Sequence, residues 1–236
     1  MRKGDHRWPK QPAALTEAQE RDREAFMLAW HETLPRRYAF VEAFNQGYVA
    51  KLGVPAGTRT LEIGAGIGAH LAFEDLEAQD YYVLELREEF CRRLEQLLPA
   101  GHVMRGSIEE CQPLPDGSFD RIIAIHVLEH LRDLPRAIAE VSRLLRPNGM
   151  FDVVLPTEGG LAYEIARKIS AERLFRQRFG SDYTPIIRSE HVNTFAEVRS
   201  LLTAAFTIES SRYFPGVLPG AEFNVCAGFR LRHSIA

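Results

Sequence analysis

From residue 60 onward the sequence alternates short β-type runs with amphipathic helical windows, and this alternation limits the possible folds more than any other feature. Such alternation is typical of α/β proteins in which helices connect parallel strands. The expected strands are residues 60–63, 81–86, 102–105, 119–127, 150–155, 207–214 and 223–231. We therefore predict an α/β fold with a doubly wound, mostly parallel sheet of seven strands.

Two helical segments are expected before the first strand. Residues 16–19 have the spacing of a capping box, and we expect the helix that follows them to end at Pro35. A second series of apolar residues at helical spacing ends near Gly53. The pattern predicts an N-terminal helical cap over residues 1–55 and one larger domain over residues 56–236.

The segment after the fifth expected strand is too long for a simple crossover. We predict that residues 157–194 form an insertion over the active face. Its basic residues are Arg167, Lys168, Arg173, Arg176, Arg178 and Arg188. We interpret them as a solvated helical face, with an anionic acceptor site as the alternative.

Composition and charge exclude several classes of protein. The 236 residues are 45% hydrophobic, which suits one core with a small appendage. A net charge of −3 provides no basic field, so no nucleic-acid partner is expected. No run of 18 apolar residues occurs, so no membrane span is expected. Cys91, Cys111 and Cys226 are dispersed, which predicts neither a disulfide framework nor a thiolate zinc site and favours a cytoplasmic location.

A glycine-rich turn follows the first expected strand. Residues 61–68 read LEIGAGIG, and the three glycines allow the backbone to approach a ligand closely. Extended to Ala69, the turn also fits the G-x-G-x-x-A pattern of nicotinamide dinucleotide sites, so the glycines alone leave both ligands open. The carboxylate of Glu62 suits an ammonium group and would repel a pyrophosphate, which argues against the dinucleotide.

Four further segments follow the glycine turn in order. Glu85 stands 21 residues beyond Gly64, and the stretches PLPDGSFD (113–120), HVLEHL (126–131) and RLLRPNG (143–149) come after it. With these motifs, residues 58–156 resemble the class I S-adenosylmethionine (SAM) dependent methyltransferases of the small-molecule type. The resemblance implies a Rossmann-like sheet whose last strand is antiparallel, SAM as the cofactor, and methyl transfer as the activity.

The resemblance also assigns the residues that would bind SAM. The glycine turn would wrap the methionine part of the cofactor, and Glu85 would accept hydrogen bonds from both ribose hydroxyls. Ser107 stands where the family often has an aspartate that accepts from the adenine amino group, and a hydroxyl accepts more weakly. The complete set of expected cofactor contacts is Tyr38, Glu62, Gly64, Gly66, Gly68, Glu85, Leu86, Ser107, Ile108, Glu109 and His126.

Three histidines are candidates for the chemistry. A hydroxyl acceptor benefits from a base as its proton leaves, whereas the methyl transfer itself is an in-line displacement that needs positioning. His126 is expected at the carboxyl end of the fourth strand, where open α/β sheets bind ligands. His130 and His191 are the other two candidates, and a purely structural role is the alternative for each of them.

Residues 126–130 also spell H-x-x-E-H, the helical zinc motif of the inverted zincins. That motif needs one continuous helix through both histidines, whereas residues 119–126 form a β-branched run that predicts a strand. We therefore expect no bound metal.

The sequence predicts a SAM-dependent methyltransferase that acts on an oxygen of a small-molecule acceptor. Three alternatives remain at this stage: methylation of a macromolecule, a nicotinamide-dependent dehydrogenase, and a SAM-binding module without catalysis.

Overall fold

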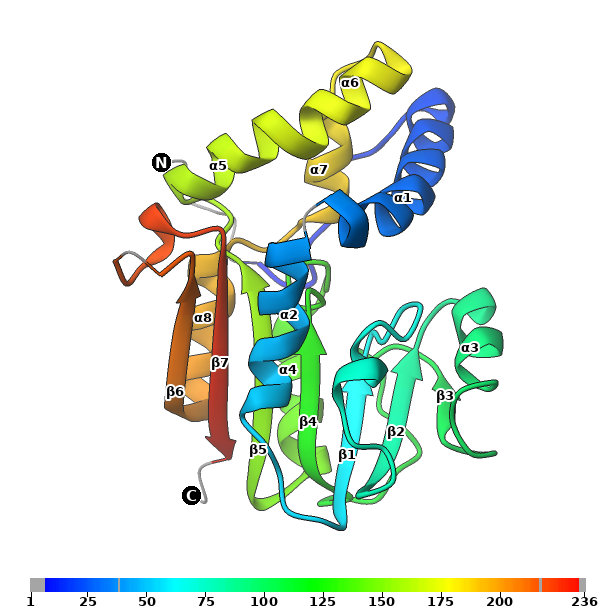
Figure 1. Ribbon diagram of the computed structural model, residues 1–236, viewed down its shortest axis with the longest axis vertical. Coiled ribbons are helices and arrows are strands. Elements are labelled where there is room, and N and C mark those ends of the chain that lie inside the picture. The colour runs from blue at the N-terminus through cyan, green and yellow to red at the C-terminus, as the bar shows by residue number, and fades with distance from the viewer. Residues whose placement is uncertain (1–6, 38, 217, 234–236) are drawn as a thin grey trace.

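The computed structural model describes residues 7–37, 39–216 and 218–233. Its seven strands form one sheet in the order β3-β2-β1-β4-β5-β7-β6 (Figure 1). β1 pairs in parallel with β2 and β4, and the parallel pairing continues from β2 to β3 and from β4 to β5. β7 is antiparallel to both of its neighbours, so the prediction of a mostly parallel seven-stranded sheet with an antiparallel last strand is confirmed.

The strands are β1 (Thr58–Ile63), β2 (Gln79–Glu85), β3 (Val103–Arg105), β4 (Phe119–Ile125), β5 (Leu145–Pro156), β6 (Phe206–Phe214) and β7 (Cys226–His233). The α-helices are α1 (Glu17–Arg37), α2 (Ala39–Lys51), α3 (Glu88–Leu94), α4 (Leu134–Leu144), α5 (Leu161–Arg167), α6 (Arg173–Phe179), α7 (Thr184–Glu190) and α8 (Phe195–Ala205). A π-helical turn (Lys168–Glu172) joins α5 to α6. None of the helices in the described ranges is both long and apolar enough to cross a membrane.

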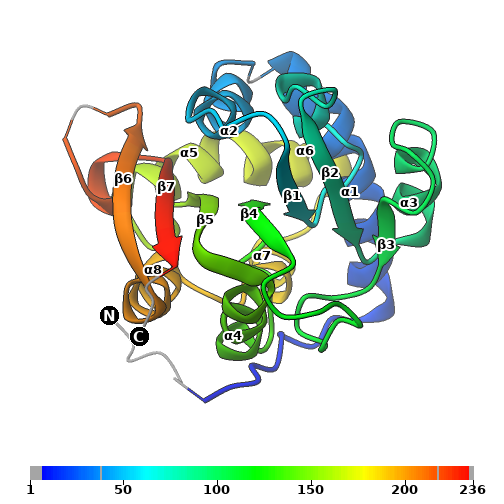
Figure 2. The same ribbon diagram turned by 90° about the horizontal axis from the view of Figure 1, so that it is seen from below.

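Each face of the sheet carries its own apolar core. α4 and α8 cover one face and α2 covers the other (Figure 2). The side chains of β4 alternate between the two cores, with Ile122 and Ala124 in the first and Ile123 in the second. A strand with apolar side chains on both faces is typical of the centre of a parallel sheet.

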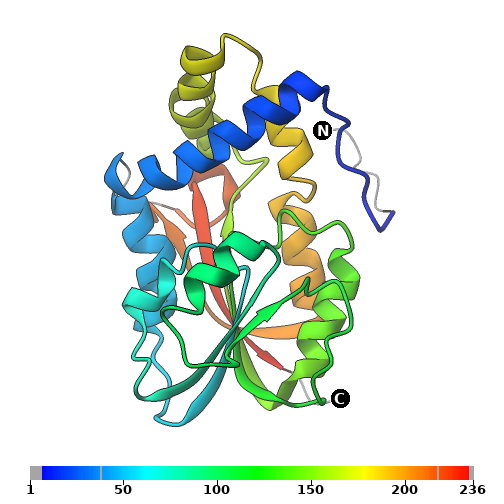
Figure 3. The same cartoon turned by 90° about the vertical axis from the view of Figure 1, so that its right-hand side faces the viewer.

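α1, α5, α6 and α7 lie beyond the carboxyl ends of the parallel strands (Figure 3). A third apolar cluster holds this layer together, because the ring of Phe26 in α1 packs on Phe175 and Tyr183 with centroid distances of 5.2 and 5.5 Å. Segments far apart in the sequence, α1 on one side and α5 to α7 on the other, therefore form one helical layer above the edge of the sheet where ligands bind in α/β folds.

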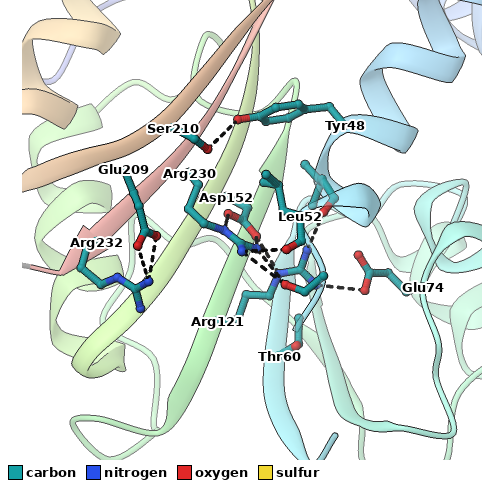
Figure 4. A network of polar contacts seen from close by, with 12 residues as sticks. Tyr48, Leu52, Thr60, Glu74, Arg121, Asp152, Glu209, Ser210, Arg230 and Arg232 are labelled. Atoms are coloured by element: carbon teal, nitrogen blue, oxygen red, sulfur yellow. Dashed lines mark hydrogen bonds and ion pairs between the residues drawn. The ribbon is translucent and has the colours of Figure 1, made fainter. Parts of the chain in front are cut away.

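A buried ion network joins the sheet to α2 (Figure 4). Arg121 on β4 is fully buried and donates to Asp152 on β5 at 2.7 Å and to Glu74 at 2.9 Å. Arg230 on β7 donates to the same Asp152 carboxylate and to the backbone carbonyl of Leu52. Each charged group has a partner, which a buried ion needs because desolvation is costly.

Some expected boundaries were wrong. α1 continues past Pro35 to Arg37, because a proline in the last turn removes only one backbone hydrogen bond before the helix ends. β4 ends at Ile125, two residues early, because His126 has φ 54° and turns the chain out of the strand. The glycine turn leads into a single 3-10 turn (His70–Phe73), which ends as the chain becomes extended at Glu74.

Candidate active site

The glycine turn after β1 has the backbone conformation that the sequence predicts. Gly64, Gly66 and Gly68 all have positive φ angles, of 66°, 55° and 80°. A Cβ atom at Gly64 would lie 2.6 Å from Cγ2 of Val127, so the turn lies directly against the chain that leaves β4. The absence of a side chain at Gly64 therefore allows this close approach.

Glu85 is the last residue of β2, and its carboxylate reaches the glycine turn. Oε2 accepts the backbone N–H of Gly66 at 2.8 Å, and Oε1 accepts that of Arg87 at 2.9 Å. A carboxylate has about four lone-pair sites, so each oxygen keeps capacity for a further donor. Glu85 is thus held at the turn and remains able to accept hydroxyl groups.

Glu62 lies on β1 with 3% of its surface exposed, and Tyr81 donates a hydrogen bond to its Oε2 at 2.9 Å. Burial raises the pKa of this carboxyl, because the charged form loses its hydration. A cation beside it would favour the ionised form.

The other expected cofactor residues differ in exposure. Leu86 is 64% exposed, whereas Ile108 is buried in the core that packs under α4. The Ser107 hydroxyl accepts the backbone N–H of Glu109 at 3.2 Å, and the Glu109 carboxylate accepts that of Asp133. Tyr38 lies outside the described residues.

His126 follows β4 in a left-handed backbone conformation that is rare for a residue other than glycine. Its Nδ1 lies 3.2 Å from Oε1 of Glu129, and its Nε2 is buried without a hydrogen-bond partner in the described part of the chain. Burial alone would lower the pKa of His126, but the nearby Cys226 sulfur and the Glu129 carboxylate raise it above the usual value of a histidine.

His130 and His191 meet edge to face, with ring centroids 4.8 Å apart. Nδ1 of His130 lies 2.9 Å from the backbone carbonyl of Glu190, and Nδ1 of His191 contacts the carboxylate of Glu158. Burial lowers the pKa of His130. Burial also disfavours the charged form of His191, but its hydrogen bond with Glu158 raises the pKa of His191 overall.

Glu129 lies between these histidines and is only 2% exposed. Burial would raise the pKa of this carboxyl, but the hydrogen bond with His126 and the neighbouring histidines lower it to about 2. The residues around it, 126 to 133, run as bends and turns between β4 and α4. The continuous helix that the inverted-zincin motif requires is therefore absent from this described segment.

Comparisons with known proteins agree with this geometry. The family model of a methyltransferase domain matches residues 61–153, which include the glycine turn, Glu85 and the histidine segment after β4. This part of the chain therefore resembles a SAM-dependent methyltransferase domain.

Two curated relatives indicate the range of methyltransferases that this domain resembles. Malonyl-[acyl-carrier protein] O-methyltransferase from Chlorobium phaeovibrioides is 32% identical over 160 residues, which cover 57% of this chain and 60% of that protein. Sterol 24-C-methyltransferase from Gibberella zeae is 28% identical over 135 residues, which cover 50% of this chain and 34% of that protein. The chain spans 39% to 60% of the length of the first three curated relatives.

Solved structures share the fold over most of the chain. A SAM-dependent methyltransferase from Thermotoga maritima has a TM-score of 0.63 at 17% identity, and 88% of this chain and 96% of that chain are covered. A SAM-dependent methyltransferase from Aquifex aeolicus has a TM-score of 0.56 at 15% identity, with 81% and 93% covered. At these identities the likeness shows the fold alone.

The structure brings together most of the residues that the sequence singled out. The three glycines and Glu85 form one group, and His126, His130 and His191 form a second. Contact between Gly64 and Val127 joins the two groups. The residues of both groups therefore line neighbouring parts of one edge of the sheet.

Two carboxylates of the site were not predicted as site residues. From the sequence, Glu129 was interpreted only as part of a zinc helix, and no role was predicted for Glu158. Glu158 follows β5 by two residues, so its place just beyond the carboxyl end of a central strand was the signal that could have found it.

Proposed function

We propose that this chain transfers the methyl group of SAM to an oxygen atom of a small-molecule acceptor. The observation that carries the proposal is the direct contact between the glycine turn, with Glu85 fixed against it, and the segment that bears Glu129 and the histidines. A site for a positively charged methyl donor and groups that act on a hydroxyl are thus neighbours.

The residues at the turn suit SAM. Glu85 keeps lone pairs for the ribose hydroxyls, and the buried Glu62 carboxyl would be stabilised in its charged form by the α-ammonium group. When bound, SAM supplies an electrophilic methyl group, which passes to the acceptor oxygen while the electron pair of the broken C–S bond stays on sulfur. The protein's part is to align the acceptor and to exclude water.

The choice of oxygen rests on the cluster of titratable groups. A hydroxyl must lose its proton when its oxygen is methylated. His130 is the histidine of this cluster whose pKa is lowered, so it is the group best suited to accept that proton, with His126, His191 and Glu129 beside it. The name of the Chlorobium relative, an O-methyltransferase, supports this choice, whereas the sterol relative is named for methylation of carbon.

We further propose that the helical cap of residues 1–55 and the insertion of residues 157–194 together close over the acceptor. The aromatic contacts between Phe26 and Phe175 support a joint role, because they tie α1 to α6. Arg167 is paired with Glu164 and Glu172 within the insertion, which supports an internally paired helical face rather than a site for an anionic acceptor.

Transfer of a labelled methyl group tests the proposal. Purified protein with methyl-labelled SAM should label a component of a small-molecule extract, whose mass rises by one methyl group and whose new bond is C–O. Label found only in the protein or nucleic-acid fraction, or no label at all, would contradict the proposal.

His191→Asn should lower kcat without weakening the binding of S-adenosylhomocysteine, since His191 is proposed to lie near the acceptor.

Calorimetry with S-adenosylhomocysteine tests the donor site separately. Glu85→Ala should weaken binding by about 1–3 kcal/mol, the typical loss when hydrogen bonds to a charged group are removed. Glu88→Ala is the matched control, because the ion pairs of this neighbouring carboxylate within the described ranges are with Arg92 and Arg105 at the surface. Equal affinities of the two variants would remove Glu85 from the site.

A further inference from the structure

Glu129, His130 and His191 present one candidate ligand atom each, and these atoms lie within 4.8 Å of one another. Glu129 and His130 come from the turn after β4, and His191, which is 61 residues beyond His130, comes from the end of the insertion. Ligand atoms lie about 2.0–2.2 Å from a tetrahedral Zn²⁺. Side-chain rotations that move each of the three atoms by about an ångström would therefore bring them onto one ion.

The hydrogen bonds of the two histidines leave the same nitrogen free on each ring. The backbone carbonyl of Glu190 can only accept, so Nδ1 of His130 carries the hydrogen. The Glu158 carboxylate likewise accepts the hydrogen on Nδ1 of His191. Nε2 of each ring then keeps its lone pair, and no hydrogen bond to either Nε2 is found in the described ranges. Histidine that donates its other N–H to a carboxylate or carbonyl is the usual arrangement of a metal ligand.

The Glu129 carboxylate supplies an independent indication. Oε1 is held by Nδ1 of His126, but Oε2 is buried and has no hydrogen-bond partner among the described residues. A buried carboxylate oxygen without a partner is costly, because the charge has lost its hydration. Oε1 of this carboxylate lies 4.0 Å from Nε2 of His130, so a cation bound between the carboxylate and the histidines would reduce this cost.

We propose that Glu129, His130 and His191 bind one divalent transition-metal ion, with Zn²⁺ as the ion that this donor set fits best. Two histidine nitrogens and one carboxylate oxygen form a common set for a zinc ion with an open coordination position. The side chains of His130 and His191 are 33% and 15% exposed, so the ion would be reachable from solvent on one side. The site differs from the helical zinc motif, because the third ligand comes from the insertion.

A metal here would explain how the acceptor is activated, and this part rests on the proposed function. Glu129 lies two residues after Val127, which contacts the glycine turn at Gly64. An acceptor hydroxyl in the open position would lose its proton to water more readily, because a metal ion lowers the pKa of a bound hydroxyl. Its oxygen would then form the bond to the methyl carbon of SAM, with S-adenosylhomocysteine as the second product.

Metal binding can be measured without any methyl transfer. The full chain, stripped with a chelator, is titrated by calorimetry with Zn²⁺, Mn²⁺ and Mg²⁺, and the metal content is determined after dialysis. We expect one Zn²⁺ per chain, weaker binding of Mn²⁺ and no measurable binding of Mg²⁺. Glu129→Gln and His191→Asn should each weaken Zn²⁺ binding at least tenfold, and His102→Gln, at the opposite end of the sheet, should leave the affinity unchanged.

Each outcome decides the inference. Failure of the wild-type protein to bind Zn²⁺, or equal affinity of the wild type and of both ligand variants, would overturn it. Far-UV circular dichroism identifies a variant that has not folded, in which case the other variant decides. Because SAM binding and methyl transfer are assayed separately, loss of the metal site would leave the proposed function standing, and loss of methyl transfer would leave the metal site standing.

Discussion

At the scale of single residues, backbone conformation is the most informative feature of the site. His126 and Asn148 are the non-glycine residues with positive φ in the described ranges. Such conformations cost of order 1–3 kcal/mol and persist where the surrounding structure determines them. His126 is held by Glu129, next to the glycine turn, whereas Asn148 lies in the irregular first part of β5, at the opposite end of the sheet. The strain at His126 thus falls where the site needs a fixed side chain.

The glycine turn offers a matched pair of substitutions. Gly64→Ala would place a methyl group 2.6 Å from Val127, whereas a Cβ at Gly66 meets nothing within 4 Å. Both positions have positive φ, so both variants carry backbone strain of about 1–2 kcal/mol. Gly64→Ala should lose a further 1–3 kcal/mol, roughly the cost of overpacking. Urea denaturation measures both, and equal losses in the two variants would show that Val127 can move aside.

At the scale of elements, local signals in the sequence predicted the regular structure better than its edges. The β-branched run of β4 and the capping box of residues 16–19 depend on neighbouring residues, and both are present. The start of β5 was placed five residues late, because residues 147–149 were interpreted as a turn before the strand. In the structure they form an irregularity within it, between the pairs Phe119–Leu145 and Arg121–Met150. Only the register of the neighbouring strand distinguishes a turn before β5 from an irregularity within it.

Local signals in the sequence also predicted one part of the site better than the other. The glycines and Glu85 lie on consecutive strand ends, so sequence spacing was enough to bring them together. The partners of His130 and His191 are Glu190 and Glu158, which depend on how the insertion folds back over the sheet. No local pattern specifies that contact, so the cluster around Glu129 could not be predicted.

The cap of α8 provides a test at this scale. Thr194 accepts the backbone N–H of Glu197, and the Glu197 carboxylate accepts the N–H of Thr194 at 2.9 Å. Thr194→Ala should lower the free energy of unfolding by about 1 kcal/mol, the usual cost of losing an N-cap. Thr203→Ala in the last turn of the same helix is the control, and alanine's higher helix propensity should make it neutral or slightly stabilising. A loss at Thr203 as large as that at Thr194 would exclude capping as the cause.

At the scale of the whole molecule, the ion network around Arg121 connects elements from distant parts of the chain. Arg121 joins β4 to Asp152 on β5 and, through its Nη2, to the backbone carbonyl of Val49 in α2. Arg230 brings β7 into the same network. Removing one partner of a buried ion pair leaves the other charge uncompensated, so the network makes the packing of α2 and the sheet mutually dependent.

Glu74 gives this network a measurable pH dependence. Burial alone would raise the pKa of its carboxyl, but the hydrogen bond with His70 and the ion pair with Arg121 lower it to about 2. An unfolded glutamate titrates near 4.3, so the stabilisation is complete above that pH and is lost as the pH falls toward 2. The difference in pKa corresponds to about 3 kcal/mol of stability at neutral pH.

Urea denaturation at several pH values should show Glu74→Gln less stable than the wild type at pH 7, with the difference in stability closing in acid. Glu77→Gln, at an exposed neighbouring position, should follow the wild-type curve. A gap that stays constant down to pH 2 would mean that the Glu74 carboxylate contributes nothing through its charge.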